Sequence, residues 1–225
     1  MNTVLIVEDE PLLCGVYQNL FVTLENEGKL PKNKILTAHT AEAGLSLIEE
    51  ARTSNHSIDF CMLDYRIGGQ TTDGTPKNGL MLGLEAKIHF PDCKVMMITS
   101  ITDRYVMYSI LTELNPDGFL IKSDIDLNNL KRDVGAILDG QMVYSKKVRE
   151  FVRKSRKIFK DIDDRDLKMI HLLDKGLSLP EIGTRLGLSI SGIEYRKRRI
   201  AQNLGSSSSN IQELLDYVRK ELKLI

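Results

Sequence analysis

Residues 1–10 read MNTVLIVEDE, where the apolar run Val4–Val7 passes directly into the acidic residues Glu8 and Asp9. Further short apolar runs bounded by polar residues recur along the first half of the chain: Ile35–Ala38, Phe60–Leu63, Val95–Ile98 and Gly118–Ile121. Runs that are apolar throughout are typical of parallel strands buried on both faces. They predict a five-stranded parallel sheet.

Segments with apolar residues at helical spacing separate these runs and follow the last one. They carry Leu13, Val16, Tyr17, Leu20, Phe21 and Leu24; Leu45, Ile48 and Ala51; Val106, Ile110 and Leu114; and Leu127, Leu130, Val134 and Ile137. Strands that alternate with helices predict a doubly wound α/β fold, because right-handed crossovers cover both faces of the sheet. In such folds ligands bind outside the carboxyl ends of the strands.

Polar residues stand at these strand ends: Glu8 and Asp9, Asp64, Thr99 and Lys122. Because the carboxyl ends of parallel strands share one edge of the sheet, we expect these side chains to gather there. Carboxylates that lie close together repel one another unless a cation lies between them. A hard divalent ion with oxygen ligands would fill this role, and Mg²⁺ fits best. We expect its ligands to be Glu8 or Asp9, Asp64 and the backbone carbonyl of Arg66.

The same residues predict phosphoryl transfer to a carboxylate. That reaction needs a metal on one side of the phosphoryl oxygens, and an ammonium and a hydroxyl on the other. Asp64 is the expected acceptor, with Lys122 and Thr99 as the donors.

This pattern resembles the CheY-like receiver family over roughly residues 2–140, with Phe119 at the aromatic switch position. The resemblance implies that a sensor histidine kinase phosphorylates Asp64, that Thr99 moves toward the phosphate and that Phe119 rotates inward. The chain departs from the family in residues 65–79, a longer Gly-rich loop that lacks a Pro at the family's usual position although it contains Pro76. This loop either reshapes kinase docking or alters phosphate lifetime, or it is simply a solvated loop. Ser123 replaces a Pro that often follows the lysine.

After Gly140 the pattern is helical only, beginning with a basic amphipathic stretch, residues 146–160. Four helices are then expected: one capped by Asp163 or Asp164 and ended by Gly176, one over Pro180–Leu186, one after the turn 187–189 through Leu204, and one over residues 211–222. The second unit is therefore predicted to be a small all-α domain.

The net charge of zero hides an uneven distribution. Residues 1–144 hold 12 Lys and Arg against 20 Asp and Glu, whereas residues 145–225 hold 19 against 11. A basic half suggests a polyanionic partner, because Lys and Arg that neutralise phosphates release counterions. The alternative is that the two halves neutralise each other across an interface.

Residues 160–222 resemble the LuxR-type helix-turn-helix. The resemblance implies double-stranded DNA as the partner and a recognition helix capped by Ser189. The expected base-edge contacts are Glu194, Tyr195 and Arg198, with Lys197 as an alternative. Phosphate contacts are expected from Arg196, Lys197 and Arg199, and Ser189 and Ser191 are also expected to bind DNA. Gly192 and Glu194 depart from the family pattern: Gly192 lowers the helix propensity and Glu194 lowers the local positive charge. We therefore expect a low DNA affinity per monomer, for which dimerisation would compensate.

Together the two resemblances imply a NarL/LuxR-type response regulator: a receiver (1–140), a partly helical linker (141–160) and a DNA-binding domain (161–225). It would act as a phosphorylation-dependent transcriptional regulator and homodimer, and as an enzyme only toward its own phosphorylation and dephosphorylation. One alternative is a basic module that docks an acidic protein instead of DNA. Another is a phosphatase of the same architecture, although His39, His56, His89 and His171 are poorly placed as nucleophiles.

Composition adds two expectations. The apolar runs are too short to span a bilayer and the start lacks a basic leader, which predicts a cytoplasmic protein without membrane partners. Cys14, Cys61 and Cys93 are odd in number and far apart in sequence, so we expect buried thiols and neither a disulfide framework nor a CxxC site.

Overall fold

The computed structural model describes all of the chain except residues 1, 69–76, 159–162, 204–214 and 217–225. By its internal contacts the chain forms two compact units. The first comprises residues 1–102 and 109–149, and the second comprises residues 103–108 and 150–225. Each unit has its own hydrophobic core.

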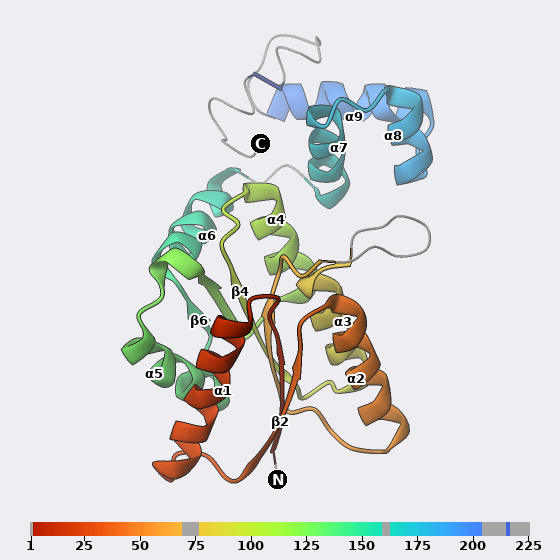
Figure 1. The fold of residues 1–225 in the computed structure, drawn as a ribbon. Coiled ribbons are helices and arrows are strands. Elements are labelled where there is room, and N and C mark those ends of the chain that lie inside the picture. The colour runs from red at the N-terminus through yellow and green to blue at the C-terminus, as the bar shows by residue number, and fades with distance from the viewer. Residues whose placement is uncertain (1, 69–76, 159–162, 204–214, 217–225) are drawn as a thin grey trace. The chain divides into compact units, whose positions relative to one another are not determined.

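The first unit is built on a six-stranded parallel sheet with strand order β2-β1-β3-β4-β5-β6 (Figure 1). Its strands are β1 (Asn2–Val7), β2 (Asn33–Ala38), β3 (Phe60–Asp64), β4 (Lys94–Thr99), β5 (Gly118–Ile121) and β6 (Val143–Tyr144). The first five contain the predicted apolar runs, which confirms the doubly wound α/β fold. The sixth was not predicted, because two residues are too few to give a periodic pattern.

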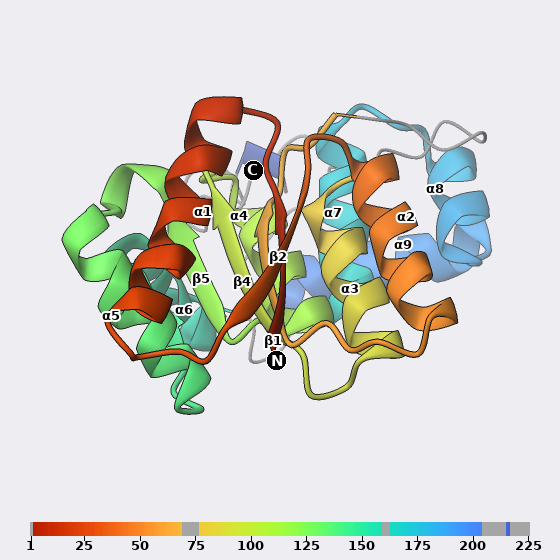
Figure 2. The same ribbon diagram turned by 60° about the horizontal axis from the view of Figure 1, so that its bottom comes forward.

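Helices cover both faces of the sheet (Figure 2). They are α1 (Pro11–Asn26), α2 (Ala41–Thr53), α3 (Gly79–His89) and α5 (Leu127–Leu138), together with a π-helical turn (Ile110–Leu114) and a 3₁₀ turn (Lys122–Asp124). In Figure 2, α1 and α5 lie on one side of the sheet, and α2 and α3 on the other. Pro11 starts α1, where its missing N–H is one that no helical carbonyl would bind.

The hydrophobic core beneath α1 and α5 reflects the fact that successive side chains of a strand point to opposite faces of the sheet. Every second residue of the central strands points toward these two helices, as Val4 and Ile6 do in β1 and Phe60 and Met62 do in β3. The intervening residues, such as Leu5 and Cys61, are equally buried. Because both faces are covered, the polar groups available for chemistry lie at the strand ends.

The second unit is helical. Its elements are α4 (Arg104–Ser109, of which residues 104–108 belong to this unit), α6 (Lys146–Ile158, whose residues 150–158 belong here), α7 (Asp164–Asp174), α8 (Leu179–Leu186) and α9 (Ile190–Asn203). Ile170, Ile182, Ile193 and Ile200 are fully or almost fully buried in its core. An all-α unit is confirmed. The helix predicted over residues 211–222 lies outside the described residues apart from Leu215 and Asp216, which are helical.

The turn between α8 and α9 is tight. Gly187 ends α8 in the left-handed region, with φ 63°, which a side chain would disfavour. A Cβ on Gly183 would lie 2.7 Å from the backbone oxygen of Leu188, so only glycine lets the chain turn this closely. Among the described residues, no helix has the length and apolar character required to cross a membrane.

Candidate functional site

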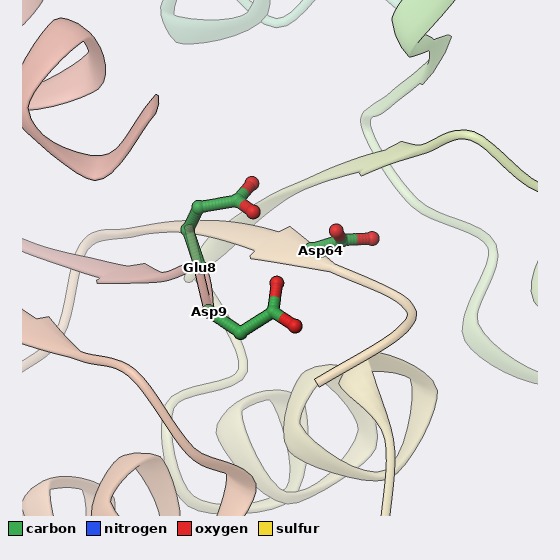
Figure 3. A group of neighbouring side chains, drawn as sticks. All are labelled: Glu8, Asp9 and Asp64. Atoms are coloured by element: carbon green, nitrogen blue, oxygen red, sulfur yellow. The ribbon is translucent and has the colours of Figure 1, made fainter. Parts of the chain in front are cut away.

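Three carboxylates meet at the carboxyl ends of β1 and β3. One carboxylate oxygen from each of Glu8, Asp9 and Asp64 lies within 4.8 Å of the others, and the three side chains surround a common space (Figure 3). Glu8 and Asp64 are buried, whereas Asp9 is exposed. The sequence prediction that these residues converge therefore holds in the structure.

Lys122, the first residue after β5, completes the cluster. Its Nζ donates hydrogen bonds to Glu8 Oε1 at 2.9 Å and to Asp64 Oδ2 at 2.7 Å. Burial alone would lower the pKa of this ammonium, but the hydrogen bonds that it donates to Asp64 and Glu8 outweigh burial and hold the pKa above its ordinary value. Lys122 is therefore a fixed positive charge in the pocket.

The pocket still carries more negative than positive charge. Burial, and less strongly the nearby charge of Asp64, raise the pKa of Glu8, although its hydrogen bond to Lys122 opposes the shift. Glu8 Oε2 is buried and has no hydrogen-bond partner among the described residues. A buried carboxylate oxygen without a partner is costly, and a bound cation would satisfy it. The donor set of carboxylate oxygens thus fits a hard divalent ion.

Asp64 is held from two sides. Its Oδ1 accepts a hydrogen bond from the backbone N–H of Arg66 at 3.0 Å, while its Oδ2 accepts from Lys122. Behind it, a Cβ on Gly79 would lie 2.0 Å from the backbone oxygen of Asp64. The first residue of α3 must therefore be glycine for Asp64 to keep this position, a requirement that the sequence analysis missed.

Thr99 and Phe119 occupy the neighbouring strands β4 and β5. Thr99 is fully buried at the end of β4, and its Oγ1 accepts a hydrogen bond from the N–H of Ile101 at 3.1 Å. Phe119 is also fully buried, and pairs with Met97 in the parallel register. The structure places both residues, but it does not test the movements that the receiver resemblance implies.

His39, which the sequence analysis set aside, lies beside the pocket. Its Nδ1 is 2.9 Å from the backbone oxygen of Glu8, so the ring supports the turn that carries Glu8 and Asp9. The contact joins residues 31 positions apart, and no local pattern could have revealed it. In the long loop 65–79, residues 69–76 lie outside the described part, so the predicted role of that loop is untested.

In the second unit, Ser189 caps α9 as predicted. Its Oγ accepts a hydrogen bond from the N–H of Gly192 at 3.1 Å, and contacts Ser191 Oγ at 3.0 Å. Ile190 and Tyr195 are the two large apolar side chains on α9 that are more than half exposed. The exposed start of α9 therefore offers free N–H groups, hydroxyls and apolar surface to a partner.

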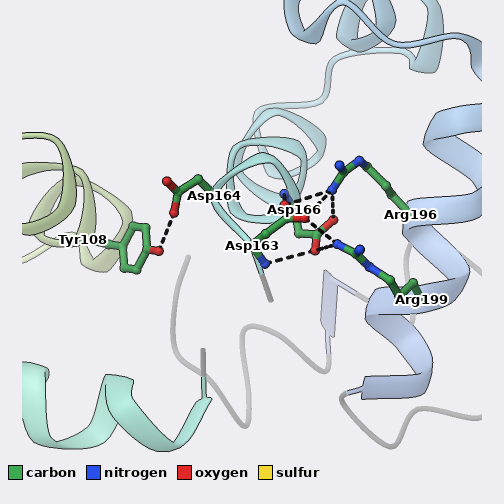
Figure 4. A network of polar contacts seen from close by, with 6 residues as sticks. All are labelled: Tyr108, Asp163, Asp164, Asp166, Arg196 and Arg199. Carbon is green, nitrogen blue, oxygen red and sulfur yellow. Dashed lines mark hydrogen bonds and ion pairs between the residues drawn. The ribbon is translucent and has the colours of Figure 1, made fainter. Parts of the chain in front are cut away.

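The basic run on α9 is largely paired inside the unit. Arg196 Nη1 lies 2.8 Å from Asp163 Oδ2 and 2.7 Å from Asp166 Oδ1, and Arg199 Nη2 pairs with the same two aspartates (Figure 4). Asp166 is fully buried. Asp163 also caps α7 in a capping box with Asp166, so we name these four residues the Asp–Arg clamp. Beside it, the Tyr108 hydroxyl donates to Asp164 at 2.7 Å.

The other two cations of the run differ from each other. Lys197 is almost buried and pairs with Glu194 at 2.7 Å. Arg198 is exposed, and within the described part of the chain it has no acidic partner; its Nε donates to the backbone oxygen of Glu194 at 3.3 Å. Their contacts with DNA stay predictions. Judged by the described residues, Arg198 is the cation of residues 196–199 that can bind a partner without breaking an internal ion pair.

No protein-family model matches the chain. Its curated relatives include the oxygen regulatory protein NreC of Staphylococcus aureus, which is 26% identical over 157 residues, covering 64% of this chain and 70% of NreC. Similar solved structures include a complex of the two-component response regulator RcsB with DNA, with a TM-score of 0.55 at 20% identity over 98% of this chain and 100% of that chain.

A second solved structure is RcsB from Salmonella enterica serovar Typhimurium bound to the promoter P1flhDC in the presence of the phosphomimetic BeF3⁻. It gives a TM-score of 0.59 at 18% identity, covering 96% of this chain and 97% of that chain. At such identities the likeness concerns the fold. The comparisons thus agree with the predicted resemblance, and the chain has the fold of a two-component response regulator, a receiver followed by a helix-turn-helix unit.

Proposed function

We propose that the chain is a transcriptional regulator of a two-component system that binds DNA when Asp64 is phosphorylated. The observation that carries the proposal is the cluster of Glu8, Asp9, Asp64 and Lys122 at one edge of the sheet, joined in one chain to a capped helix-turn-helix. The relatives support it: RcsB is described as a DNA-bound response regulator, and its phosphomimetic complex is with a promoter.

Mg²⁺ is the proposed cofactor, held by Glu8 or Asp9, by Asp64 and by the backbone carbonyl of Arg66. When bound, it would neutralise charge on the phosphoryl oxygens. Asp64 Oδ1 or Oδ2 attacks phosphorus, and the donor's leaving group departs on the opposite side. The Lys122 ammonium, now 2.7 Å from Asp64 Oδ2, shifts to the transferred phosphoryl group. The Thr99 hydroxyl, whose Oγ1 now accepts from the N–H of Ile101, then donates a hydrogen bond to a phosphoryl oxygen, and Phe119 rotates inward.

The proposed partners are a sensor histidine kinase as phosphate donor, double-stranded DNA, and a second copy of the chain once phosphorylated. The chain acts as an enzyme only toward its own phosphate, and the proposed location is the cytoplasm. On DNA, Arg198, Tyr195 and Glu194 face base edges. Ser189 and Ser191 lie at the start of α9, where free N–H groups and the helix dipole favour a backbone phosphate.

Phosphorylation is tested with acetyl phosphate as donor and intact-mass measurement as readout. We expect the wild type to gain one phosphoryl group when Mg²⁺ is present, and Asp64→Ala to gain none. Asp92→Asn removes an exposed aspartate from the turn before β4 and serves as the matched control. Equal labelling of Asp64→Ala and the wild type would defeat the proposal.

DNA binding is tested by selecting duplexes from a randomised pool with the full-length protein phosphorylated by acetyl phosphate in Mg²⁺, and titrating the best duplex against salt. Each neutralised phosphate contributes a slope of about −0.9 to the logarithm of the affinity against the logarithm of salt concentration. A flat dependence, or the absence of any selected duplex, would contradict the proposal.

One observation favours a second candidate, a basic unit that docks an acidic protein. Three of the four cations at residues 196–199 are paired within the unit, which leaves less free charge for a DNA backbone. The duplex selection separates the two candidates: a protein-docking unit enriches no sequence, and Arg198→Ala leaves its weak duplex binding unchanged.

A further inference from the structure

Two of the three cysteines lie side by side although 32 residues separate them in the chain. Cys93 Sγ is 3.6 Å from Cys61 Sγ, and both residues are buried, with exposed fractions of 3% and 0%. Cys14 belongs instead to the core beneath α1 and α5. The chain therefore holds one thiol pair and one separate thiol, neither of which takes part in the proposed phosphoryl chemistry.

The strand register explains the approach. Cys61 in β3 pairs with Val95 in β4, and the hydrogen bond from Lys94 N to Asp59 O continues the ladder toward Cys93. Cys93 precedes Val95 by two residues, so it points to the same face of the sheet as Cys61 and meets it along a diagonal. An exposed turn at residues 91–92 lies directly before Cys93.

We propose that Cys61 and Cys93 form a reversible intrachain disulfide on exposure to a hydroperoxide, which makes the pair a site of oxidative modification. A disulfide needs the sulfur atoms to approach to about 2.05 Å. Diagonal neighbours have Cα atoms roughly 7–8 Å apart, slightly beyond the usual range for a disulfide. The turn at residues 91–92 must shift to close the bond, and a disulfide formed under such strain is easily reduced.

The order of the steps follows from the surroundings of the two thiols. Cys61 lies fully buried inside β3, where the hydrogen bond with Cys93 and burial raise its pKa well above the usual value, whereas Cys93 follows the exposed turn directly. The sulfur of Cys93, beside the turn, attacks one oxygen of hydrogen peroxide and the O–O bond breaks; the Cys93 thiol proton passes to the departing hydroxide, so sulfenic acid and one water form. Cys61 sulfur then attacks Cys93 sulfur, its proton leaves with the hydroxyl as a second water, and the S–S bond forms. The two sulfurs lose two electrons and the peroxide gains them.

The experiment treats the native full-length protein with hydrogen peroxide, unfolds it in denaturant with iodoacetamide, and maps the peptides by mass spectrometry. We expect two of the three thiols to become unavailable, a mass loss equal to two hydrogen atoms, and one linked peptide pair containing Cys61 and Cys93. Cys14 should be alkylated. Dithiothreitol should restore all three thiols.

Matched variants and a second measurement separate proximity from general reactivity. Cys14→Ser should leave the link unchanged, whereas Cys93→Ser should abolish it and leave Cys61 reduced. Peroxide added to the unfolded wild type should give a mixture of all three pairings, because proximity is then lost; this arm needs no folded variant. Three free thiols in the native protein, a link to Cys14, or sulfinic acid at Cys93 without a link would overturn the proposal.

Discussion

A Cβ atom at residue 79 would lie 2.0 Å from the backbone oxygen of Asp64 and 2.8 Å from its carbonyl carbon. The backbone must move to admit even a methyl group. We expect Gly79→Ala to destabilise the first unit by about 1–3 kcal/mol, the usual cost of overpacking. Because the shift reaches Asp64, phosphorylation by acetyl phosphate should also slow.

Gly15 provides the control, since a Cβ there meets nothing within 4 Å. Gly15→Ala in the interior of α1 should stabilise the protein by about 0.5–1 kcal/mol through lower chain entropy, with phosphorylation unchanged. Urea unfolding measures the first effect and intact-mass kinetics the second. If both variants unfold alike, the close approach of α3 to Asp64 does not constrain residue 79.

Arg198 and Arg199 are adjacent, but we expect their substitution by alanine to have different effects. Arg198 makes no ion pair with any residue that the structure describes, so Arg198→Ala should reduce discrimination between the selected duplex and a scrambled one by about 1–3 kcal/mol, while leaving unfolding unchanged. Arg199→Ala breaks contacts with Asp163 and with the fully buried Asp166. Its main effect should therefore be a lower stability of the second unit, not a loss of discrimination between duplexes.

Duplex titrations and urea unfolding of each variant check this contrast. Arg165→Ala removes an exposed cation of α7 and controls for the loss of net charge alone. If Arg199→Ala leaves stability intact and weakens binding to every duplex equally, Arg199 is a phosphate contact, as the sequence analysis expected. The Asp–Arg clamp would then contribute little to the stability of the second unit.

At the scale of whole elements, the Asp–Arg clamp ties the first turn of α7 to the middle of α9. Burial alone would raise the pKa of Asp163, but the hydrogen bonds donated by Arg196, by Arg199 and by the backbone N–H of Asp166 outweigh burial and hold the pKa well below its ordinary value of 3.8. A carboxylate with a lowered folded-state pKa stabilises the fold at pH values above its unfolded-state pKa. That contribution is lost as the pH falls through 3.8 toward the folded-state pKa.

Asp163→Asn isolates this contribution, because asparagine remains a good N-cap but carries no charge. We expect the wild type to exceed the variant in unfolding free energy by about 1 kcal/mol at neutral pH, the upper end for an exposed pair. The difference should shrink below about pH 4, as followed by urea unfolding in a pH series. A difference that stays constant with pH would mean that Asp163 acts only as a cap; Asp92→Asn should show no difference.

The elements also show what could be predicted from the sequence. The five long strands were predictable because strands buried on both faces consist of unbroken apolar runs, and Asp64 and Lys122 were predictable because the carboxyl ends of parallel strands share an edge. The close approach of Gly79, the contact of His39 with Glu8 and the pairing of Cys61 with Cys93 depend on which residues meet across the fold, which periodicity does not encode. The run of positive charges at residues 196–199 likewise does not reveal that two of its arginines pair with a buried carboxylate, that of Asp166.

At the scale of the whole molecule, an acidic unit proposed to accept a phosphoryl group and a basic unit proposed to bind DNA share one chain. A phosphoryl group adds a charge of about −1.5 to −2 at Asp64. If this charge controls DNA binding, the two sites are coupled by a free energy, and coupling energies are typically 1–3 kcal/mol, or about 5- to 150-fold in affinity. Coupling of this kind is reciprocal for reversible ligands.

Beryllofluoride, a reversible mimic of the phosphoryl group, allows both directions to be measured on the wild-type chain with Mg²⁺. We expect it to tighten binding of the selected duplex by about 5- to 150-fold, and the duplex to tighten beryllofluoride binding by the same factor. Asp64→Ala should retain the basal duplex affinity and lose the gain, since the acceptor carboxylate is missing. Equal gains in both proteins would place the effect of beryllofluoride outside the pocket, and unequal factors in the two directions would rule out simple coupling between Asp64 and the DNA-binding unit.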